Sequence, residues 1–374
     1  MAKSVIFIAS LLKPVDEPRM YEKLAYSLSQ TNKYEVNIIG SYSNSASRDV
    51  NIIFHPVFQN SRFSFLRLFP SSKIWKVLIK LKPEVIIANS HELLIVSILY
   101  KILFGCNLIY DIRENYAINL LSQKVYPPII AYPLAAWVRL KEITSKPFIA
   151  KYLLAEKSYF EELTFCQSKS VILQNKYQPE GNDPNIGQRT MHRFLFSGTL
   201  SKSAGVFEAI NLVKSLHELD NRISLVIIGY CPILVDRIKL KEQANKNSFI
   251  TLIGIDTLVG HARIMDEIRL AHFGIISYRL NASNRDCVPT KLYEYLANDL
   301  LVVSVDNHQW NELIKRHQTG LFFDTKNFEP ETILENLGQL AVLDDSNKEE
   351  LMWSSEEPKL LELVNLLVPQ KNKF

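Results

Sequence analysis

Short runs of β-branched and other apolar residues alternate with longer segments of helical periodicity along most of the chain. In the first half, strand-like runs lie at 5–9, 34–39, 85–88 and 107–111, and helical patterns lie at 19–30 and 91–104. These runs are apolar at consecutive positions, which is typical of strands buried on both faces of a parallel sheet. The alternation of strands and helices predicts crossover units and a doubly wound α/β sheet.

A polar segment rich in turn-forming residues interrupts this pattern at 177–193. The alternation then restarts, with a helical pattern at 205–219 and strand-like runs at 194–196, 225–229, 248–253, 273–276, 300–304 and 321–323. We therefore expect two α/β domains, at 1–176 and 194–355, joined by this linker. An amphipathic helix follows within 356–374, and it either caps the second domain or crosses back to the first.

The composition narrows the class of protein. The chain has 374 residues, of which 47% are hydrophobic and 22% charged, and this excludes a fully disordered or fibrous protein. The net charge of +4 is too small for a dedicated nucleic-acid binder. The longest apolar run, 93–100, is far shorter than the roughly 18 residues that cross a bilayer, and the first residues lack a signal-peptide pattern.

The cysteines indicate a reducing compartment. Cys106, Cys166, Cys231 and Cys287 lie far apart in the chain and form no C-x-x-C pair. This spacing argues against a disulfide framework and against a clustered zinc site. We expect reduced thiols in a cytoplasmic protein, without a bound metal or cofactor.

Candidate ligand contacts lie directly after strands, because open α/β sheets bind ligands at the carboxyl ends of their strands. The run at 194–196 is followed by Gly198, Thr199 and Lys202, and a helix begins near Gly205. Small residues let the backbone approach a ligand, and a helix N-terminus offers N–H groups to an anion. A plain strand-to-helix turn explains the same residues, since no G-x-G-x-x-G or Walker sequence is present.

The segment 284–297 is more informative. Pro289 or Thr290 begins a helix there, with Asp286 in the preceding loop and Glu294 in the second turn. Leu292 belongs to the apolar face of this helix, whereas Lys291, Glu294 and Asn298 share the opposite stripe. That stripe is either solvated or lines a cleft. In a cleft, the carboxylate would accept hydrogen bonds from both hydroxyls of a ribose, and Lys291 would add positive charge beside a diphosphate.

Residues 289–297, P-T-K-L-Y-E-Y-L-A, resemble the P-x-K-L-x-E-Y-L-A element of GT-B glycosyltransferases, in particular the retaining enzymes of family four. The resemblance implies a GT-B fold, in which two Rossmann-like domains face a cleft; the first binds the acceptor and the second a nucleotide sugar. It implies that Glu294 holds the ribose and that Asp286, a catalytic residue, contacts hydroxyls of the donor sugar. Pro289, Thr290 and Leu292 are then donor-binding positions of the motif.

Further segments resemble the same family. Residues 197–200 with 204–206 are similar to its phosphate loop, which would place Gly198, Thr199 and Lys202 beside the donor, although Thr199 and Ala204 replace the usual arginine and lysine. Residues 16–23 are similar to a D-x-x-R opening, and 110–115 to a Y-D-x-H-E segment. The resemblance implies a catalytic position for Arg113, in the place of the histidine, and an acceptor side that comprises Asp16, Arg19 and Glu114.

His91 follows the strand-like run at 85–88, so we also expect it on the acceptor side, although a surface histidine at a helix start explains it equally. Residues 62–82 contain no acidic residue. Apolar and aromatic side chains are interleaved there with basic ones, namely Arg62, Arg67, Lys73, Lys76, Lys80 and Lys82. The pattern predicts contact with an anionic membrane surface; the alternative places the apolar residues in the core. A lipid-linked acceptor would explain this segment and a second apolar stretch, 126–137.

Together these features predict a cytoplasmic glycosyltransferase, peripheral on the inner face of the plasma membrane. It would move a sugar from a nucleotide-sugar donor to a saccharide or lipid-linked saccharide in cell-surface polysaccharide or glycoconjugate synthesis, with retention. We expect no metal, no cofactor and no nucleic-acid partner. The alternatives are a weakened relative that acts as a partner subunit, motivated by Thr199 and Ala204, and a nucleotide-sugar epimerase or hydrolase.

Overall fold

The computed structural model describes residues 3–43, 49–58, 71–122, 126–179, 189–317, 320–340 and 348–368. The chain divides into two compact units, and each is described by itself. Unit 1 comprises Met1–Gln178 and Trp353–Phe374, and unit 2 comprises Pro179–Met352. The C-terminal segment from Trp353 onward therefore belongs to unit 1.

Unit 1 is built on a seven-stranded sheet in which every strand pair is parallel. The strand order is β3-β2-β1-β4-β5-β6-β7. The strands are β1 (Ser4–Pro14), β2 (Tyr34–Ser41), β3 (Ile52–Phe58), β4 (Val85–Ala88), β5 (Asn107–Ile112), β6 (Lys151–Leu154) and β7 (Ser170–Ile172). The order reverses between β1 and β4, which is the switch point of a doubly wound sheet.

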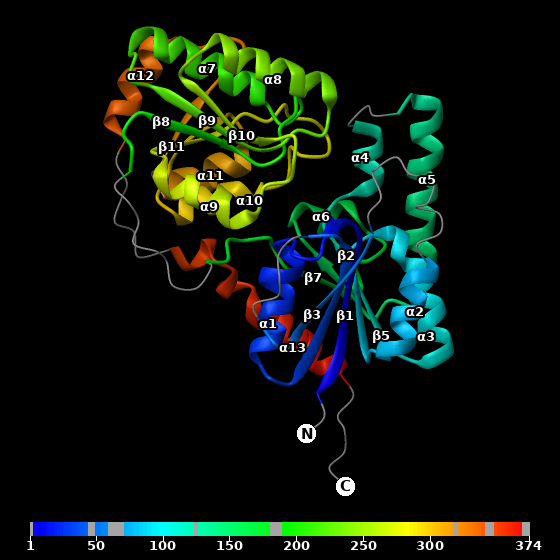
Figure 1. The fold of residues 1–374 in the computed structure, drawn as a ribbon. Coiled ribbons are helices and arrows are strands. Elements are labelled where there is room, and N and C mark those ends of the chain that lie inside the picture. Colours follow the sequence, from blue (N-terminus) through cyan, green and yellow to red (C-terminus); the bar gives the residue numbers. More distant parts are fainter. Residues whose placement is uncertain are drawn as a thin grey trace. The chain divides into compact units, whose positions relative to one another are not determined.

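Helices cover both faces of this sheet (Figure 1). On one face lie η1 (Arg19–Ala25), α1 (Tyr26–Gln30) and α13 (Glu357–Leu367), and on the other α2 (Ser71–Leu81) and α3 (Leu94–Phe104). The remaining helical segments are η3 (His91–Leu93), α4 (Tyr116–Ser122), α5 (Pro128–Ser145), α6 (Ser158–Glu162), η4 (Gln167–Lys169) and η6 (Trp353–Ser355). Because both faces are covered, β4 is completely buried, as its continuous apolar sequence predicts.

The C-terminal helix crosses back, which was one of the two placements expected from the sequence. Leu360 and Val364 of α13 are fully buried in the same apolar cluster as Ile6, Ile38 and Leu28 of unit 1. Trp353 anchors the segment, since its indole Nε1 donates to Ser27 Oγ at 2.8 Å. Burial of each large apolar side chain contributes about 1.5–3 kcal/mol, so this helix is an integral part of unit 1.

Unit 2 repeats the architecture with a six-stranded parallel sheet of order β10-β9-β8-β11-β12-β13. The strands are β8 (Arg193–Ser197), β9 (Ser224–Tyr230), β10 (Ile250–Ile255), β11 (Phe273–Ile276), β12 (Leu301–Val305) and β13 (Gly320–Phe323). The helical segments are α7 (Val206–Leu219), α8 (Leu234–Lys246), α9 (His261–Leu270), α10 (Thr290–Ala297), α11 (His308–Arg316), α12 (Pro330–Gln339) and η5 (Lys348–Leu351). The switch point of this sheet lies between β8 and β11. The predicted doubly wound α/β class is therefore confirmed in both units.

The basic segment expected at a membrane falls only partly within the described residues. Arg62 and Arg67 lie outside them. On α2 the exposed side chains include Lys73, Lys76 and Lys80, whereas Ile74 and Leu78 are buried in unit 1. Ile74 and Leu78 thus belong to the core, whereas Ile79 and the lysines are exposed. Within the described ranges, no helix combines the length and the apolarity needed to cross a membrane.

Candidate functional site

Two loops meet at the switch point of unit 2, one after β8 and one after β11. The first runs from Ser197 into α7, and Gly205 precedes that helix in a left-handed conformation with φ of +83°. A Cβ atom on Gly205 would lie 1.6 Å from the carbonyl oxygen of Ser277, which follows β11. Because only glycine permits this approach, the loop after β8 packs directly against the end of β11.

The same loop also lies close to the end of β9. Gly198 has φ of +103°, and open space lies where its Cβ would project. A Cβ on Gly229, at the end of β9, would lie 1.8 Å from the Gly198 carbonyl oxygen. The backbone of the loop is thereby held close to two strands, while its outer side carries the exposed residues Thr199 and Lys202. The donor-loop residues named from the sequence are thus gathered at one sheet edge.

The second loop leads into α10, which begins at Thr290 after Pro289, as the sequence predicts. Two side chains of the neighbouring α11 segment fix this loop. Trp310 Nε1 donates to the Cys287 carbonyl at 2.7 Å, and the Asn307 amide donates to the Arg285 carbonyl at 2.8 Å. These two hydrogen bonds hold the loop by its backbone carbonyl groups and do not use its side chains.

Glu294 lies in the second turn of α10 with its side chain only 10% exposed. Its Oε1 atom is 3.0 Å from Nε2 of His261, the first residue of α9. His261 could not be selected from local sequence patterns, because its partner Glu294 is 33 positions away on a helix that follows another strand. The carboxylate thus sits inside unit 2, next to an imidazole, and not on a solvated face.

Lys291 is also buried, unlike a residue of a solvated stripe. Its Nζ donates to the Ser197 carbonyl at 3.2 Å and lies 4.2 Å and 4.6 Å from the ring centres of Phe196 and Tyr278. Burial lowers the pKa of Lys291 to about 7, although the carboxylate of Glu294 opposes this shift. The ammonium group therefore acts on the backbone of the loop after β8; the direct diphosphate contact expected from the sequence stays a prediction.

Tyr295 also contacts Ser197, at the start of the loop after β8. Its hydroxyl lies 2.8 Å from Ser197 Oγ and accepts from the Ser197 N–H at 3.2 Å. Its ring fills the space above Gly274 in β11, where a Cβ atom would lie 2.4 Å from a ring carbon. Asn298 and Leu292 are buried as well, so every residue of α10 after Thr290 is buried. The side chain of Leu292 packs in the core of unit 2, and its place among the donor-binding residues stays a prediction.

Asp286 is far more accessible than Glu294. Its side chain is 45% exposed and lies 3.3 Å from the guanidinium of Arg285, which is 68% exposed. A pair this exposed contributes little to stability, because solvent screens both charges. Asp286 is therefore accessible to a ligand, although the structure does not test the sugar contact expected of it.

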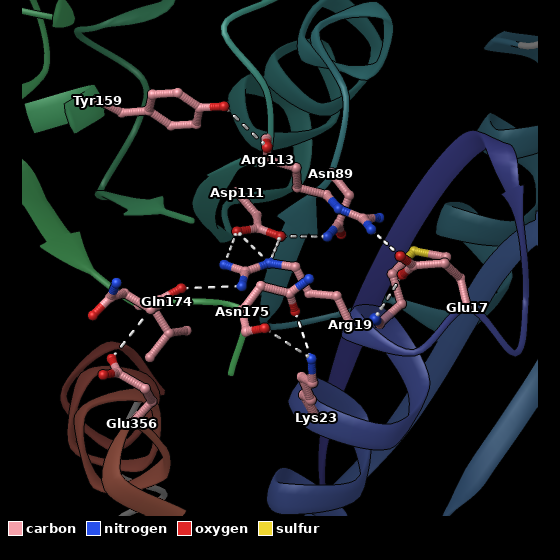
Figure 2. A network of polar contacts seen from close by, with 12 residues as sticks. Glu17, Arg19, Lys23, Asn89, Asp111, Arg113, Tyr159, Gln174, Asn175 and Glu356 are labelled. Atoms are coloured by element: carbon pink, nitrogen blue, oxygen red, sulfur yellow. Dashed lines mark hydrogen bonds and ion pairs between the residues drawn. The ribbon is translucent and has the colours of Figure 1, made fainter. Parts of the chain in front are cut away.

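In unit 1, Arg113 lies at the carboxyl end of β5 and forms an ion pair with Glu17, which follows β1 (Figure 2). Burial lowers the pKa of Arg113, but the carboxylates of Glu17 and Asp111 outweigh it and hold the pKa above its ordinary value. Burial raises the pKa of Glu17, but the charges of Arg113 and Lys13 and the hydrogen bonds from Arg113 and the Met20 N–H together outweigh it and lower the pKa to about 2. Both groups are therefore ionised near neutral pH. Glu17 was not selected from the sequence, which offered no motif for it.

Arg19 is 1% exposed and forms a bidentate pair with Asp111, with Nε–Oδ2 and Nη2–Oδ1 distances of 2.9 Å and 2.7 Å (Figure 2). Its third nitrogen donates to the Leu173 carbonyl, and the Asn89 amide donates to Asp111 at 2.6 Å. In this structure the guanidinium is fully engaged inside unit 1. A contact between Arg19 and an acceptor stays a prediction.

The other acceptor-side residues also follow strands of unit 1. Asp16 accepts a hydrogen bond from Ser43 Oγ at 2.6 Å, and Glu114 accepts one from the Asn119 amide at 2.8 Å. His91 lies after β4, where Nδ1 is 2.9 Å from Lys141 Nζ and the ring packs edge-on against Tyr116. These three residues come from the carboxyl ends of β1, β4 and β5, so the fold brings them to one edge of the sheet. Within the described part of the chain, no group of histidine, cysteine or acidic side chains has the arrangement of a metal site.

Comparisons with known proteins agree with this architecture. Residues 187–352 match the family model "Glycosyl transferases group 1". Among proteins with curated functions, no sequence matches the chain. Sucrose-phosphate synthase from Thermosynechococcus elongatus has a similar structure, with a TM-score of 0.70, 12% identity, and coverage of 98% of this chain and 99% of that chain.

Two further structures are similar over almost the whole chain. HepE from Anabaena in complex with UDP and glucose has a TM-score of 0.65 and 12% identity, covering 97% of this chain and 100% of that one. The catalytic domain of starch synthase IV from Arabidopsis thaliana, bound to ADP and acarbose, has a TM-score of 0.65 and 11% identity, with coverage of 98% and 100%. The chain therefore has the two-domain GT-B fold of these structures, and its residues 187–352 match the glycosyl transferases group 1 model.

Proposed function

We propose that the protein transfers a sugar from a nucleotide-sugar donor to a saccharide or lipid-linked saccharide acceptor, with retention, in the synthesis of a cell-surface polysaccharide or glycoconjugate. The observation that carries this proposal is the burial of the Glu294 carboxylate in the second turn of α10, at the switch point of unit 2. Open α/β sheets bind nucleotides at this position. HepE, which is similar in fold, has been crystallised with UDP-glucose.

In the proposed complex, the Glu294 carboxylate accepts hydrogen bonds from the two ribose hydroxyls of the donor, and His261 fixes its orientation. The diphosphate lies against the N-terminus of α10 and the loop at Gly198 and Thr199, where the dipole of the helix stabilises negative charge. Lys202 is exposed on the same loop and supplies a positive charge. Lys291 contributes indirectly, because it holds the carbonyl of Ser197.

The transfer step needs little acid–base chemistry from the protein. Asp286 binds hydroxyls of the donor sugar, and the leaving phosphate takes the proton of the acceptor hydroxyl as the new glycosidic bond forms. Arg113 provides positive charge from unit 1 and cannot act as a base, because Glu17 and Asp111 raise its pKa. Orientation and stabilisation of the developing diphosphate charge then account for most of the catalysis.

We further propose that the acceptor binds at the carboxyl edge of the unit 1 sheet, near Asp16, His91 and Glu114. The protein would work in the cytoplasm, peripherally on the inner face of the plasma membrane. The exposed lysines of α2 support contact with anionic lipids, because this helix carries no acidic residue. A lipid-linked acceptor would be presented at the same surface.

Calorimetric titration with uridine and guanosine diphosphates tests the donor site. Glu294→Gln should weaken binding of the preferred nucleotide about 10- to 100-fold, because hydrogen bonds to a charged acceptor are worth about 1.5–3 kcal/mol. The matched control is Glu312→Gln, on the exposed side of α11 in the same unit, which should bind like the wild type. Unchanged affinity in Glu294→Gln would remove this residue from the donor site.

One observation favours a second function, that of a partner subunit without activity of its own. Thr199 and Ala204 stand where the resembled phosphate loop has cations, and Ala204 is buried. If no nucleoside diphosphate binds the wild-type protein, the subunit function is favoured. Product analysis of a nucleotide sugar with and without an acceptor separates transfer from hydrolysis or epimerisation, since only transfer depends on the acceptor.

A further inference from the structure

Helix α5 of unit 1 is apolar on both its inner and its outer side. Ala131, Ala135 and Val138 face inward and are buried. The outward side chains are larger, and they include Ile129, 84% exposed, and Trp137, 53% exposed. A helix that is apolar all round is normally buried, so the outer side of α5 has the composition of a surface that is covered in use.

Helix α3 also carries large apolar side chains on its outer side. Its outward side chains Ile95, Leu99, Ile102 and Leu103 are all more than half exposed. The two helices contact each other, and they lie with α2 on the same side of the unit 1 sheet (Figure 1). We call the exposed apolar side chains of α3 and α5 the α3–α5 face. Because it spans two neighbouring helices, it is a continuous feature and not a set of scattered surface residues.

The charges around this face are almost all positive. The helices α2, α3 and α5 contain one acidic residue, Glu142, which is 2% exposed and bound to Arg139 and Tyr110. Lys73, Lys76 and Lys80 of α2 are exposed, and Lys141 Nζ lies 5.9 Å from the ring centre of Trp137. An apolar surface beside unopposed lysines is complementary to a layer with an anionic exterior and an apolar interior.

We propose that the α3–α5 face inserts into the headgroup region of an anionic bilayer, with the lysines of α2 at the phosphates. This rests on the proposed function, because a lipid-linked acceptor would be reached from that position. The helices lie in the interface and do not span it, in agreement with the absence of a membrane-crossing helix from the described residues. A protein partner that covered the α3–α5 face would need acidic residues around its contact surface to match the lysines of α2.

The test is flotation of the full-length protein with vesicles of phosphatidylcholine containing 30% phosphatidylglycerol, a content chosen on the order of that of an anionic membrane. The triple variant Trp137→Gln, Leu140→Gln, Ile143→Gln should partition about tenfold less strongly, because apolar area drives insertion. The matched control Leu219→Gln, Leu258→Gln, Leu366→Gln removes three exposed but scattered apolar side chains, and it should float like the wild type.

A second triple variant, Lys73→Gln, Lys76→Gln, Lys80→Gln, separates charge from apolar insertion. It should lose about tenfold in partitioning to the anionic vesicles, and its residual binding should equal that of the wild type to pure phosphatidylcholine. Equal flotation of the wild type and the α5 variant would overturn the proposal. So would a wild-type protein that ignores vesicles but forms a dimer in sedimentation that the α5 variant abolishes, since the face would then be a protein interface.

Nucleotide titration of the same samples keeps this test apart from that of the donor site. The α5 variant should bind the preferred nucleoside diphosphate like the wild type, because its substitutions lie in unit 1 and the donor site in unit 2. Loss of vesicle binding with intact nucleotide binding supports the membrane proposal alone. Intact vesicle binding in a protein that binds no nucleotide contradicts the proposed transfer and leaves the membrane proposal standing.

Discussion

The sheets of unit 1 and unit 2 share one strand order over six strands, and unit 1 adds β7 at one edge. The charged side chains at the carboxyl edges of the two sheets nevertheless differ in burial and pairing. At the edge of unit 1, the buried guanidinium of Arg19 pairs with Asp111, and Arg113, whose side chain is 11% exposed, pairs with Glu17. The edge of unit 2 also has buried charges, at Lys291 and Glu294. It differs in that Asp286 and Lys202 are exposed beside a loop whose tight course depends on glycine.

This difference follows from the cost of burying charge. A buried ion must find its partner within the protein, so the ion pairs of unit 1 form a fixed framework before any ligand arrives. An exposed charge is solvated in the free protein, and it exchanges water for a ligand at little cost. We therefore expect a ligand to bind at the carboxyl edge of unit 2, and we expect the Arg19–Asp111 pair to contribute to the stability of unit 1.

Breaking the pair in unit 1 should have the largest effect on stability. Asp111→Ala leaves the Arg19 guanidinium buried without a carboxylate, and this should lower the free energy of unfolding by about 3–5 kcal/mol. Equilibrium unfolding in urea measures the change. The control Lys241→Met breaks a pair of the same 2.7 Å length whose side chains are each 50% exposed, and it should have no measurable effect. If both variants lose a similar amount of unfolding free energy, buried and exposed ion pairs do not differ in stability as we expect.

The glycine-dependent loop of unit 2 should be the next most sensitive. Gly205→Ala places a Cβ atom against the Ser277 carbonyl at positive φ, and it should lower the unfolding free energy by about 2 kcal/mol or more. Gly338→Ala is the matched control, since no atom lies within 4 Å of the added Cβ in α12. That change should raise stability by about 0.4–1 kcal/mol. If Gly205→Ala does not change the unfolding free energy, the loop accommodates the added Cβ atom without loss of stability.

The regular elements could be predicted from sequence where strands are buried on both faces. The runs at 85–88 and 273–276 coincide with β4 and β11, because continuous apolar sequence leaves little ambiguity. β3 was missed, since it is an edge strand that contains His55 and Pro56. Such an edge strand lacks the pattern on which the prediction depends.

The site was only partly predictable for a different reason. The motif at 289–297 located the start of α10 and the position of Glu294 along it. It did not show that Lys291 is buried beneath Ser197, 94 positions away, or that His261 contacts Glu294. These contacts depend on which strands are neighbours in the sheet, and local spacing does not encode that order.

The buried lysine of unit 2 predicts a pH dependence. The pKa of Lys291 is about 7 in the folded protein against an ordinary value of 10.5. Between these values the unfolded chain binds more protons than the folded one, so the unfolding free energy should rise with pH from about 7 to 10. The slope contributed by this residue is at most about 1.4 kcal/mol per pH unit. Urea unfolding of the wild type and of Lys291→Met across this pH range should show the rise in unfolding free energy only in the wild type. If the unfolding free energies of both proteins change with pH in parallel, Lys291 is not the source of the rise.

The smallest effect on stability should accompany a large effect on transfer. Asp286→Asn removes a charge that is exposed and weakly paired, so the urea unfolding curve should not change. If the carboxylate binds the donor sugar, transfer should fall about 10- to 100-fold while the affinity for the nucleoside diphosphate stays the same, because the diphosphate lacks that sugar. Arg285→Gln, which removes the partner of Asp286, is the matched control for the surface pair and should keep full activity. An Asp286→Asn variant with normal transfer would assign this exposed charge to solvation alone, and the contrast between the two sheet edges would then depend on Lys202.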